Sequence, residues 1–179
     1  MSGVETTTLG QIADFVTRGD EEGLTAELPG LILLAMGVLT TEQNELRAAL
    51  LSATSPMQFG ERAKHDPRQP HPLSGVGFHL RLPVGERAVL GRGPRCDIVV
   101  PDESVSEEHC RLEALEDGLA VCDLRSTNGT RINQLPLQGD VPGYLALGDL
   151  LTTGRCSFQL HSAATLYAEL EAIALLGDS

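Results

Sequence analysis

The sequence predicts a mainly β fold: an antiparallel β-sandwich with a helical region before it and a single helix after it. Apolar residues recur at three- and four-residue intervals before residue 52 and again after residue 162, which is the spacing of amphipathic helices. Between residues 75 and 161 they alternate with polar residues in short runs separated by turn-forming groups. Many short strands of this kind are typical of a β-sandwich.

The N-terminal region, residues 1–51, is expected to be helical and accessory to the sandwich. A first helix is predicted from apolar residues at helical spacing: Leu9, Ile12, Phe15 and Val16. After a Pro-Gly break, the apolar run Leu31–Leu39 is interpreted as a short buried helix, and a third helix is predicted to begin at Thr40. Residues 52–74 contain four prolines together with Ser, Gly, His and charged residues, a composition that indicates a linker.

The sandwich is predicted over residues 75–161. After an alternating segment that begins at Val76, its strands are predicted at Ala88–Leu90, Ile98–Val100, Cys110–Ala114, Leu119–Cys122, Thr130–Ile132, Leu145–Leu147 and Ser157–Leu160. Residues 162–179 are expected to form a C-terminal helix because four apolar residues fall on one side of it: Leu166, Leu170, Ile173 and Leu176.

Composition and charge exclude several classes of partner. The 179 residues carry a net charge of -12 and only 3% are aromatic, so neither the cationic surface nor the stacking rings of a nucleic-acid-binding protein are expected. The same charge argues against binding to anionic membranes.

The four cysteines form no Cys-x-x-Cys pair and are expected to be buried thiols, so neither a metal site nor a cofactor is predicted. The first ten residues do not resemble a secretory leader, and a cytoplasmic location is expected.

Three segments between the predicted strands carry polar groups suited to a phosphate. Gly91-Arg92 follows one strand, Ser106–His109 precedes another, and Asp123–Thr130 joins two more. The guanidinium group of arginine presents a fork of donors that matches phosphate oxygens, and Ser, Thr and Asn add short directional donors. Loops at one end of a sandwich can bring such groups together on a rigid scaffold. The sequence therefore predicts a site for a single phosphate group on a protein that is acidic overall.

These segments, in this order, resemble the forkhead-associated (FHA) family. The resemblance covers about residues 75–161 and rests on these stretches: Leu90–Arg92, Cys96–Val100, Val105–His109, Asp123–Thr130, Leu147–Leu151 and Gly154. It implies an eleven-stranded β-sandwich that binds phosphothreonine peptides and has no catalytic activity. The resemblance therefore implies an adaptor in Ser/Thr kinase signalling, with a phosphothreonine-containing protein and a Ser/Thr protein kinase as expected partners.

The resemblance also implies a role for each residue of the site. Arg92 and Ser106 are expected to contact the phosphate. Thr127 is expected to contact the phosphate and the threonine methyl group, and Asn128 the peptide backbone. Three further residues are expected to support the binding loops: Gly91, His109 and Gly129. This donor set suits a phosphothreonine, which carries about -1.5 to -2 charges and strong acceptor oxygens.

Two acidic residues depart from the family pattern beside the phosphate position. Glu107 and Glu108 follow Ser106, where the family often has a neutral or basic residue. A carboxylate a few ångströms from the phosphate would weaken binding by on the order of 1 kcal/mol or more. Arg125 and Arg95 are candidates to offset this repulsion. The alternative function is therefore a phosphate-independent protein-interaction scaffold that retains the FHA fold.

The N-terminal segment that ends at Thr8 has two interpretations. Its threonines suit the N-cap of the first helix. Val4–Thr7 is also similar to the phosphorylated threonine motif in the tail of small actinobacterial FHA regulators of 2-oxoglutarate metabolism. A second alternative function is therefore a regulator that is switched by phosphorylation of its own Thr6, Thr7 or Thr8.

No enzyme is expected from this sequence. Ser106, His109 and Asp123 would supply the side chains of a hydrolase triad, but the sequence lacks a Gly-x-Ser-x-Gly nucleophile elbow.

The helical regions are expected either to cover an edge of the sandwich or to offer a contact for a homodimer.

Overall fold

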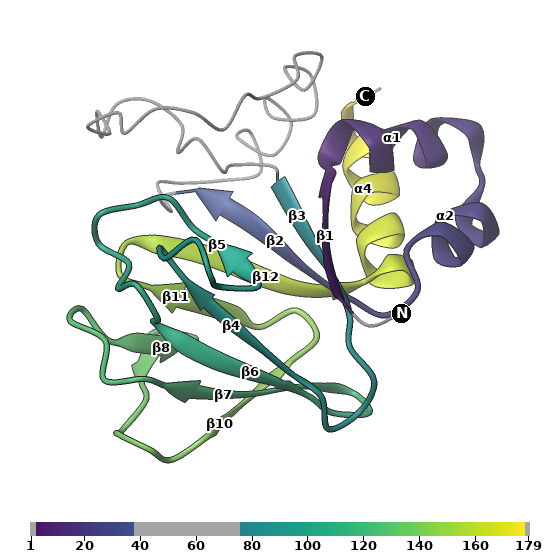
Figure 1. The fold of residues 1–179 in the computed structure, drawn as a ribbon. Coiled ribbons are helices and arrows are strands. Elements are labelled where there is room, and N and C mark those ends of the chain that lie inside the picture. The colour runs from purple at the N-terminus through teal and green to yellow at the C-terminus, as the bar shows by residue number, and fades with distance from the viewer. Residues whose placement is uncertain (1–2, 38–75, 178–179) are drawn as a thin grey trace.

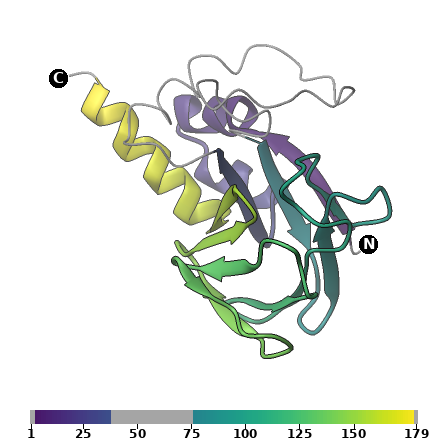
Figure 2. The same cartoon turned by 90° about the vertical axis from the view of Figure 1, so that its left-hand side faces the viewer.

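The computed structural model describes residues 3–37 and 76–177. It has three layers: two β-sheets packed face to face, and helices that cover the outer face of the larger sheet (Figure 1). The helices come from both ends of the described chain and lie on the same side of the sandwich (Figure 2). The β-sandwich with flanking helices that the sequence predicts is therefore confirmed.

The larger sheet has seven strands. In spatial order they are β1 (Gly3–Thr8), β3 (Val76–Arg81), β2 (Leu31–Gly37), β12 (Cys156–Ser162), β11 (Leu150–Thr153), β8 (Thr130–Ile132) and β9 (Leu135–Pro136). All neighbouring strands in this sheet are antiparallel. The sheet therefore combines strands from both described parts of the chain.

The smaller sheet has five strands. In spatial order they are β10 (Gly143–Ala146), β7 (Gly118–Asp123), β6 (Cys110–Ala114), β4 (Arg87–Gly91) and β5 (Ile98–Val99). The helices that the structure describes are α1 (Leu9–Arg18), α2 (Glu21–Glu27) and α4 (Ala163–Gly177). The strands predicted between residues 75 and 161 agree with the observed bounds to within two residues at either end.

Two hydrophobic cores lie on the two faces of the larger sheet. The core between the sheets contains fully buried residues from both of them, among them Leu90, Leu112, Leu151 and Phe158. The core under the helices contains residues from all three described helices, among them Leu9, Ile12, Leu24, Leu166 and Leu170. Each large apolar side chain removed from water stabilises the fold by roughly 1.5–3 kcal/mol, so the helical layer is an integral part of the domain.

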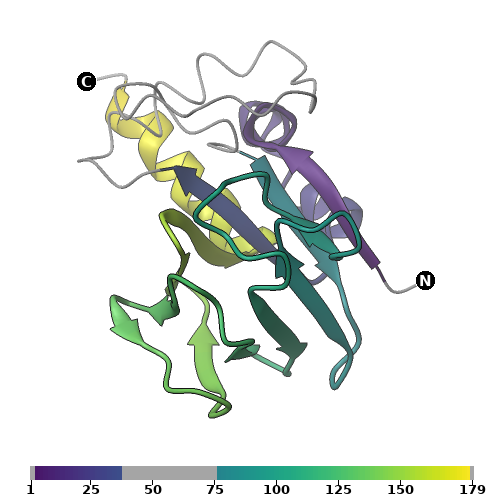
Figure 3. The same ribbon diagram turned by 60° about the vertical axis from the view of Figure 1, so that its left-hand side comes forward.

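The helix predicted for the apolar run is wrong over Leu31–Gly37, the part of the run that the structure describes. Its first seven residues form strand β2, which lies between β3 and β12 in the larger sheet (Figure 3). Leu33 and Ala35 belong to the core between the sheets, whereas Ile32 and Leu34 belong to the core under the helices. A strand buried on both faces is apolar throughout, so it lacks the alternation that distinguishes a strand from a buried helix.

The N-terminal region is therefore only partly helical. It contributes β1 and β2, and residues 76–162 contribute the other ten strands, one fewer than the eleven that the family resemblance implies for residues 75–161. The first predicted helix is confirmed as α1, and its N-cap Thr8 accepts a hydrogen bond from the Gln11 N–H at 3.3 Å. Helix α2, capped by Asp20, is not among the predicted elements. The helix predicted from Thr40 and the linker predicted at 52–74 lie outside the described residues.

Candidate functional site

Three loops of the sandwich meet at one end of it. They connect β4 to β5, β5 to β6, and β7 to β8. The Arg92 N–H donates to the Ser106 carbonyl at 2.8 Å, which joins the first two loops. The Thr127 N–H donates to the Ser106 side-chain oxygen at 3.0 Å, which joins the last two. Polar residues from three separate segments of the sequence therefore lie next to one another.

Ser106 and Thr127 present two hydroxyl groups side by side. The Oγ of Ser106 lies 3.5 Å from the Oγ1 of Thr127, in addition to its contact with the Thr127 N–H. Ser106 is half-buried and Thr127 is exposed. Because each hydroxyl has one proton to donate, the pair can bind two oxygens of the same anion.

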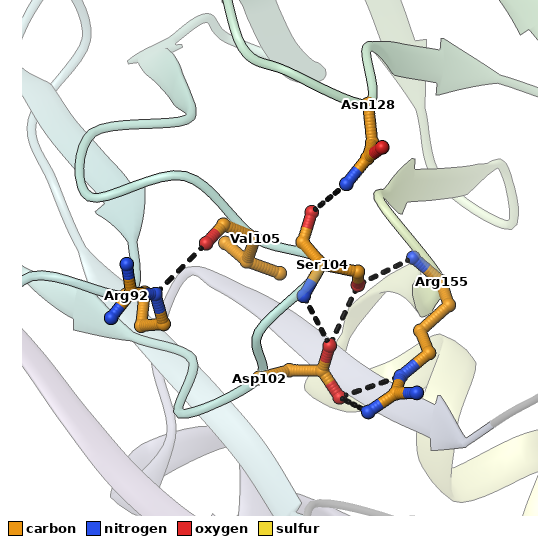
Figure 4. A network of polar contacts seen from close by, with 6 residues as sticks. All are labelled: Arg92, Asp102, Ser104, Val105, Asn128 and Arg155. Atoms are coloured by element: carbon orange, nitrogen blue, oxygen red, sulfur yellow. Dashed lines mark hydrogen bonds and ion pairs between the residues drawn. The ribbon is translucent and has the colours of Figure 1, made fainter.

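Arg92 places a positive charge beside the loop that carries Ser106. Its Nε donates to the Val105 carbonyl at 3.3 Å (Figure 4), and the residue is exposed. Arg92 makes no ion pair with any residue that the structure describes. Its guanidinium group therefore retains the charge and the remaining donors that an external anion requires.

His109 fastens two of the loops to each other. The side chain is fully buried. Its Nδ1 accepts a hydrogen bond from the Ser106 N–H at 3.0 Å, and its Nε2 lies 3.1 Å from the Gly129 carbonyl oxygen. Since Nε2 has to donate to that carbonyl, the ring is neutral and carries its proton on Nε2. Burial keeps the pKa of His109 below its ordinary value, which favours this neutral form.

Asp123 shapes the loop between β7 and β8. Its carboxylate accepts hydrogen bonds from the Ser126 N–H at 3.1 Å and from the hydroxyls of Ser126 and Thr130, both at 2.6 Å. Burial raises the pKa of Asp123, but these hydrogen bonds outweigh it and hold the pKa below its ordinary value. Both ring nitrogens of His109 bind backbone groups instead. Ser106, His109 and Asp123 therefore form no catalytic hydrogen-bond chain.

Two glycines permit the close packing of these loops. A Cβ atom at Gly91 would lie 2.3 Å from the Glu107 carbonyl oxygen, so any other residue there would force the first two loops apart. Gly129 has a φ of 75°, a left-handed conformation that favours glycine, and its carbonyl is the one bound by His109.

Asn128 is held by a network that the sequence analysis does not identify. Its Nδ2 donates to the Ser104 carbonyl at 2.7 Å. The Ser104 hydroxyl donates to Asp102 at 2.6 Å, and Asp102 forms an ion pair of 2.8 Å with Arg155 from the turn between β11 and β12 (Figure 4). The spacing Asp-x-Ser is a known signal for a local turn. Nothing in the sequence indicates that Asp102 contacts Arg155, which lies 53 positions after Asp102.

The acidic residues beside the site are exposed. Glu107 and Glu108 both face solvent, and the Glu107 carboxylate makes no ion pair with a described residue. Arg125 is also exposed, with a φ of 57°, and its closest carboxylate partner is Asp140 at 3.9 Å. No ion pair with Arg125 therefore offsets the negative charge of Glu107 in this structure.

The threonines near the N-terminus lie in strand β1. Thr6 is exposed, whereas Thr7 is 7% exposed and its hydroxyl donates to the Gln11 side chain at 3.3 Å. Thr8 caps α1, and β1 pairs with β3 along its whole length. None of the hydrogen bonds of these three threonines reaches the loops that carry Arg92, Ser106 and Asn128.

The described residues also bear on the predictions about cysteines, metal sites and membrane-spanning helices. All four cysteines are buried, as the sequence analysis predicts. Residues 3–37 and 76–177 contain no group of three or more side chains that could hold a metal ion. No helix within these ranges has the length and apolar character needed to cross a membrane.

Comparison with known proteins identifies the segment that contains the loops. Residues 88–154 match the family model of the FHA domain. The chain is 38% identical over 82 residues to the FHA domain-containing protein FhaA of Mycobacterium tuberculosis, a match that covers 45% of this chain and 14% of that protein. It is 32% identical over 84 residues to the oxoglutarate dehydrogenase inhibitor of Corynebacterium diphtheriae, covering 47% of this chain and 54% of that one.

A solved structure extends the comparison of the fold. The FHA domain of an Arabidopsis thaliana hypothetical protein aligns with a TM-score of 0.50 and 21% identity, over 75% of this chain and 86% of that chain. At this identity the likeness concerns the fold. The aligned part of this chain spans between 2% and 55% of the length of the curated relatives.

Proposed function

Residues 88–154 form an FHA domain, and from that premise we propose that the chain is a non-catalytic adaptor that binds phosphothreonine peptides in Ser/Thr kinase signalling. Arg92 and Ser106 bind the phosphate group. Thr127 contacts the phosphate and the threonine methyl group, and Asn128 binds the peptide backbone. The partner is a protein phosphorylated on threonine, and the Ser/Thr protein kinase that phosphorylates it is a second candidate partner.

The contact between Ser106 and Thr127 is the main support for this proposal. The Ser106 oxygen accepts the Thr127 N–H at 3.0 Å, which uses a lone pair and leaves the hydroxyl proton able to turn toward a bound anion. Thr127 adds a second hydroxyl 3.5 Å away, and Arg92 adds a positive charge that forms no ion pair with a described residue. Three donors of this kind match the three acceptor oxygens of a phosphate group.

A specific observation favours a second candidate function. The exposed carboxylate of Glu107 belongs to the residue that follows Ser106, and no ion pair with a described residue neutralises it. A carboxylate at this position repels a phosphate dianion. The second candidate is therefore a protein-interaction scaffold that keeps the FHA fold and binds its partner without a phosphate.

A titration with peptides distinguishes the two functions. The full chain is titrated with a phosphothreonine peptide library and with the same peptides unphosphorylated, and the best binder is then measured by calorimetry. We expect binding only to phosphorylated peptides, and its loss in Arg92→Ala.

Arg87→Ala is the matched control for this titration. Arg87 pairs with Glu113 at 2.7 Å on the smaller sheet, away from the three loops, so its loss should leave binding unchanged. If no phosphorylated peptide binds better than its unphosphorylated form, the scaffold is the correct function.

The cellular setting follows from the same proposal. We place the adaptor in the cytoplasm, where Ser/Thr kinases and their substrates are found, and propose that its acidic surface keeps it from nucleic acid and anionic membranes. The helical layer is a candidate contact for a homodimer, and Leu175 near the end of α4 is 70% exposed. Sedimentation velocity of the full chain tests this part of the proposal.

A further inference from the structure

An ion pair between the buried Asp102 and the exposed Arg155 ties the turn between β11 and β12 to the loop that carries Ser106. Asp102 is only 4% exposed. Its Oδ2 accepts hydrogen bonds from the Nε and Nη2 of Arg155 at 2.9 and 2.8 Å, and its Oδ1 accepts the N–H and hydroxyl of Ser104 at 2.8 and 2.6 Å. Charge-assisted bonds to a buried carboxylate are among the strongest in proteins, and the carboxylate is costly to leave without them.

Ser104 lies at the centre of this network (Figure 4). Its hydroxyl accepts the Arg155 N–H at 3.0 Å, and its carbonyl accepts the Asn128 Nδ2 at 2.7 Å. Gly154, the residue before Arg155, has a φ of 60°, and a Cβ atom there would lie 2.4 Å from the Ser104 carbonyl oxygen. The turn therefore packs directly against the carbonyl that orients Asn128, and its path requires glycine at this point.

The two residues that follow Ser104 belong to the candidate site. The Val105 carbonyl accepts the Arg92 Nε at 3.3 Å. The Ser106 side-chain oxygen accepts the Thr127 N–H at 3.0 Å. Of these site residues, only Asn128 binds Ser104 itself, so a displacement of Ser104 would act first on Asn128.

We propose that Asp102 and Arg155 are positioning residues of the peptide site. They hold Ser104 so that its carbonyl orients the Asn128 amide, and this is the contact through which they act on the bound peptide. The inference rests on the proposed function and extends it to two residues that neither the motifs nor the family resemblance single out. Precision matters here because hydrogen-bonding groups of a binding site have to be held to within about 0.5 Å.

The first test removes the charge of Arg155 and keeps its length. The Kd of the full chain for its best phosphothreonine peptide is measured for Arg155→Met, for the conservative Arg155→Lys and for Arg87→Met. Arg87 forms a similar ion pair of 2.7 Å, with Glu113, away from the loops.

We expect Arg155→Met to raise the Kd about tenfold, Arg155→Lys to recover part of that loss, and Arg87→Met to leave the Kd unchanged. An unchanged Kd in a folded Arg155→Met protein overturns the proposal. If Arg155→Met does not fold, Asp102→Asn takes its place, because it removes the charge and keeps the size of the side chain.

The second test asks whether Arg155 acts through Asn128. The effect of Arg155→Met is measured again in an Asn128→Ala background. If positioning is the mechanism, the Kd changes by less than about threefold in that background, because the group to be oriented is already absent. A full tenfold loss in the Asn128→Ala background would overturn the proposal, because Arg155 would then act on the peptide by another route.

The third measurement needs no peptide and separates this inference from the proposed function. The side-chain amide protons of Asn128 are followed by NMR in the free protein, where the bond to the Ser104 carbonyl slows their exchange with water. Arg155→Met is expected to shift these resonances and to speed their exchange, and unchanged resonances would overturn the inference. If the unmodified chain binds no phosphopeptide, the proposed function fails while the Asn128 resonances still decide the role of Asp102 and Arg155.

Discussion

The side-chain oxygen of Ser106 accepts a hydrogen bond from the backbone N–H of Thr127 at 3.0 Å, although the two residues lie 21 positions apart in the sequence. This bond joins the loop before β6 to the loop after β7. His109 reinforces the junction, because it accepts the Ser106 N–H and binds the Gly129 carbonyl. Ser106 is therefore both a candidate phosphate ligand and the link between two loops.

Ser106→Ala removes the candidate phosphate donor and the acceptor for the Thr127 N–H together. We expect the Kd for a phosphothreonine peptide to rise about 10- to 100-fold, since a hydrogen bond to a charged group and a loop contact are both lost. Calorimetric titration measures the change. Thr127→Val is the matched variant, because it removes one hydroxyl and keeps the backbone N–H, and its effect should be smaller. Equal affinities of Ser106→Ala and the unmodified chain would argue against the assigned site.

Glu107→Gln removes an exposed negative charge next to Ser106. We expect it to tighten phosphopeptide binding about fivefold at low salt, because the repulsion between the carboxylate and the phosphate is on the order of 1 kcal/mol. The gain should shrink as the salt concentration rises and screens the interaction.

Glu116→Gln is the control for this charge effect. Glu116 is also exposed, but it lies in the turn between β6 and β7, at the opposite end of the sandwich from the loops. Its removal changes the net charge equally and should leave affinity almost unchanged. A gain of the same size in both variants would show that net charge, and not the position of Glu107, governs binding.

His161 makes stability depend on pH. It is 2% exposed and lies 3.6 Å from Glu169, yet burial lowers the pKa of His161 to about 4 and raises the pKa of Glu169, so burial disfavours the charged form of each. The unfolded chain binds a proton at His161 near pH 6.5, before the folded chain does. The contribution of His161 to stability is therefore complete above about pH 6.5 and is lost as the pH falls toward 4.

Urea unfolding of His161→Gln between pH 7 and pH 4 measures this contribution. The unmodified chain should lose stability on the order of 3 kcal/mol from His161 over this range, and the variant should lose less. The raised pKa of Glu169 acts in the opposite direction, because the contribution of Glu169 to stability falls as the pH rises above 4.5. The unmodified chain and His161→Gln therefore have to be compared at every pH. The same slope in both forms would contradict the assignment to His161.

Residues 75–161 are not expected to fold without the N-terminal region. A fragment with these bounds lacks β2, the strand that pairs with both β3 and β12, and it lacks the helices that cover the larger sheet. We expect a poorly dispersed NMR spectrum and no cooperative unfolding transition. A well-dispersed spectrum for this fragment would show that β2 is dispensable.

Leu33→Ala in the full chain tests the same strand by a single substitution. Leu33 is fully buried between the two sheets, so its truncation should cost about 2–5 kcal/mol of stability. Leu135→Ala is the control, because Leu135 is 73% exposed and its loss should change stability by less than about 0.5 kcal/mol.

The residues of the candidate site could be proposed from the sequence, although the ion pair that holds the loop before Ser106 could not. Short polar segments that directly follow or precede strands can be recognised in a single sequence. These segments contain Arg92, Ser106, Thr127 and Asn128. The Asp102–Arg155 pair could not be predicted in the same way. It joins two turns that are 53 positions apart and come together only when the two sheets pack.

By itself, the sequence determined most strands between residues 75 and 161, helices α1 and α4, and the order of the polar loops, because local spacing and turn-forming residues specify these features. Only the tertiary structure decided that Leu31–Gly37 is a strand, because a run that is buried on both faces has the same composition in a strand and in a helix. The tertiary structure also decided that Arg155 meets Asp102, since the partner of a buried charge depends on which turns the packed sheets bring together.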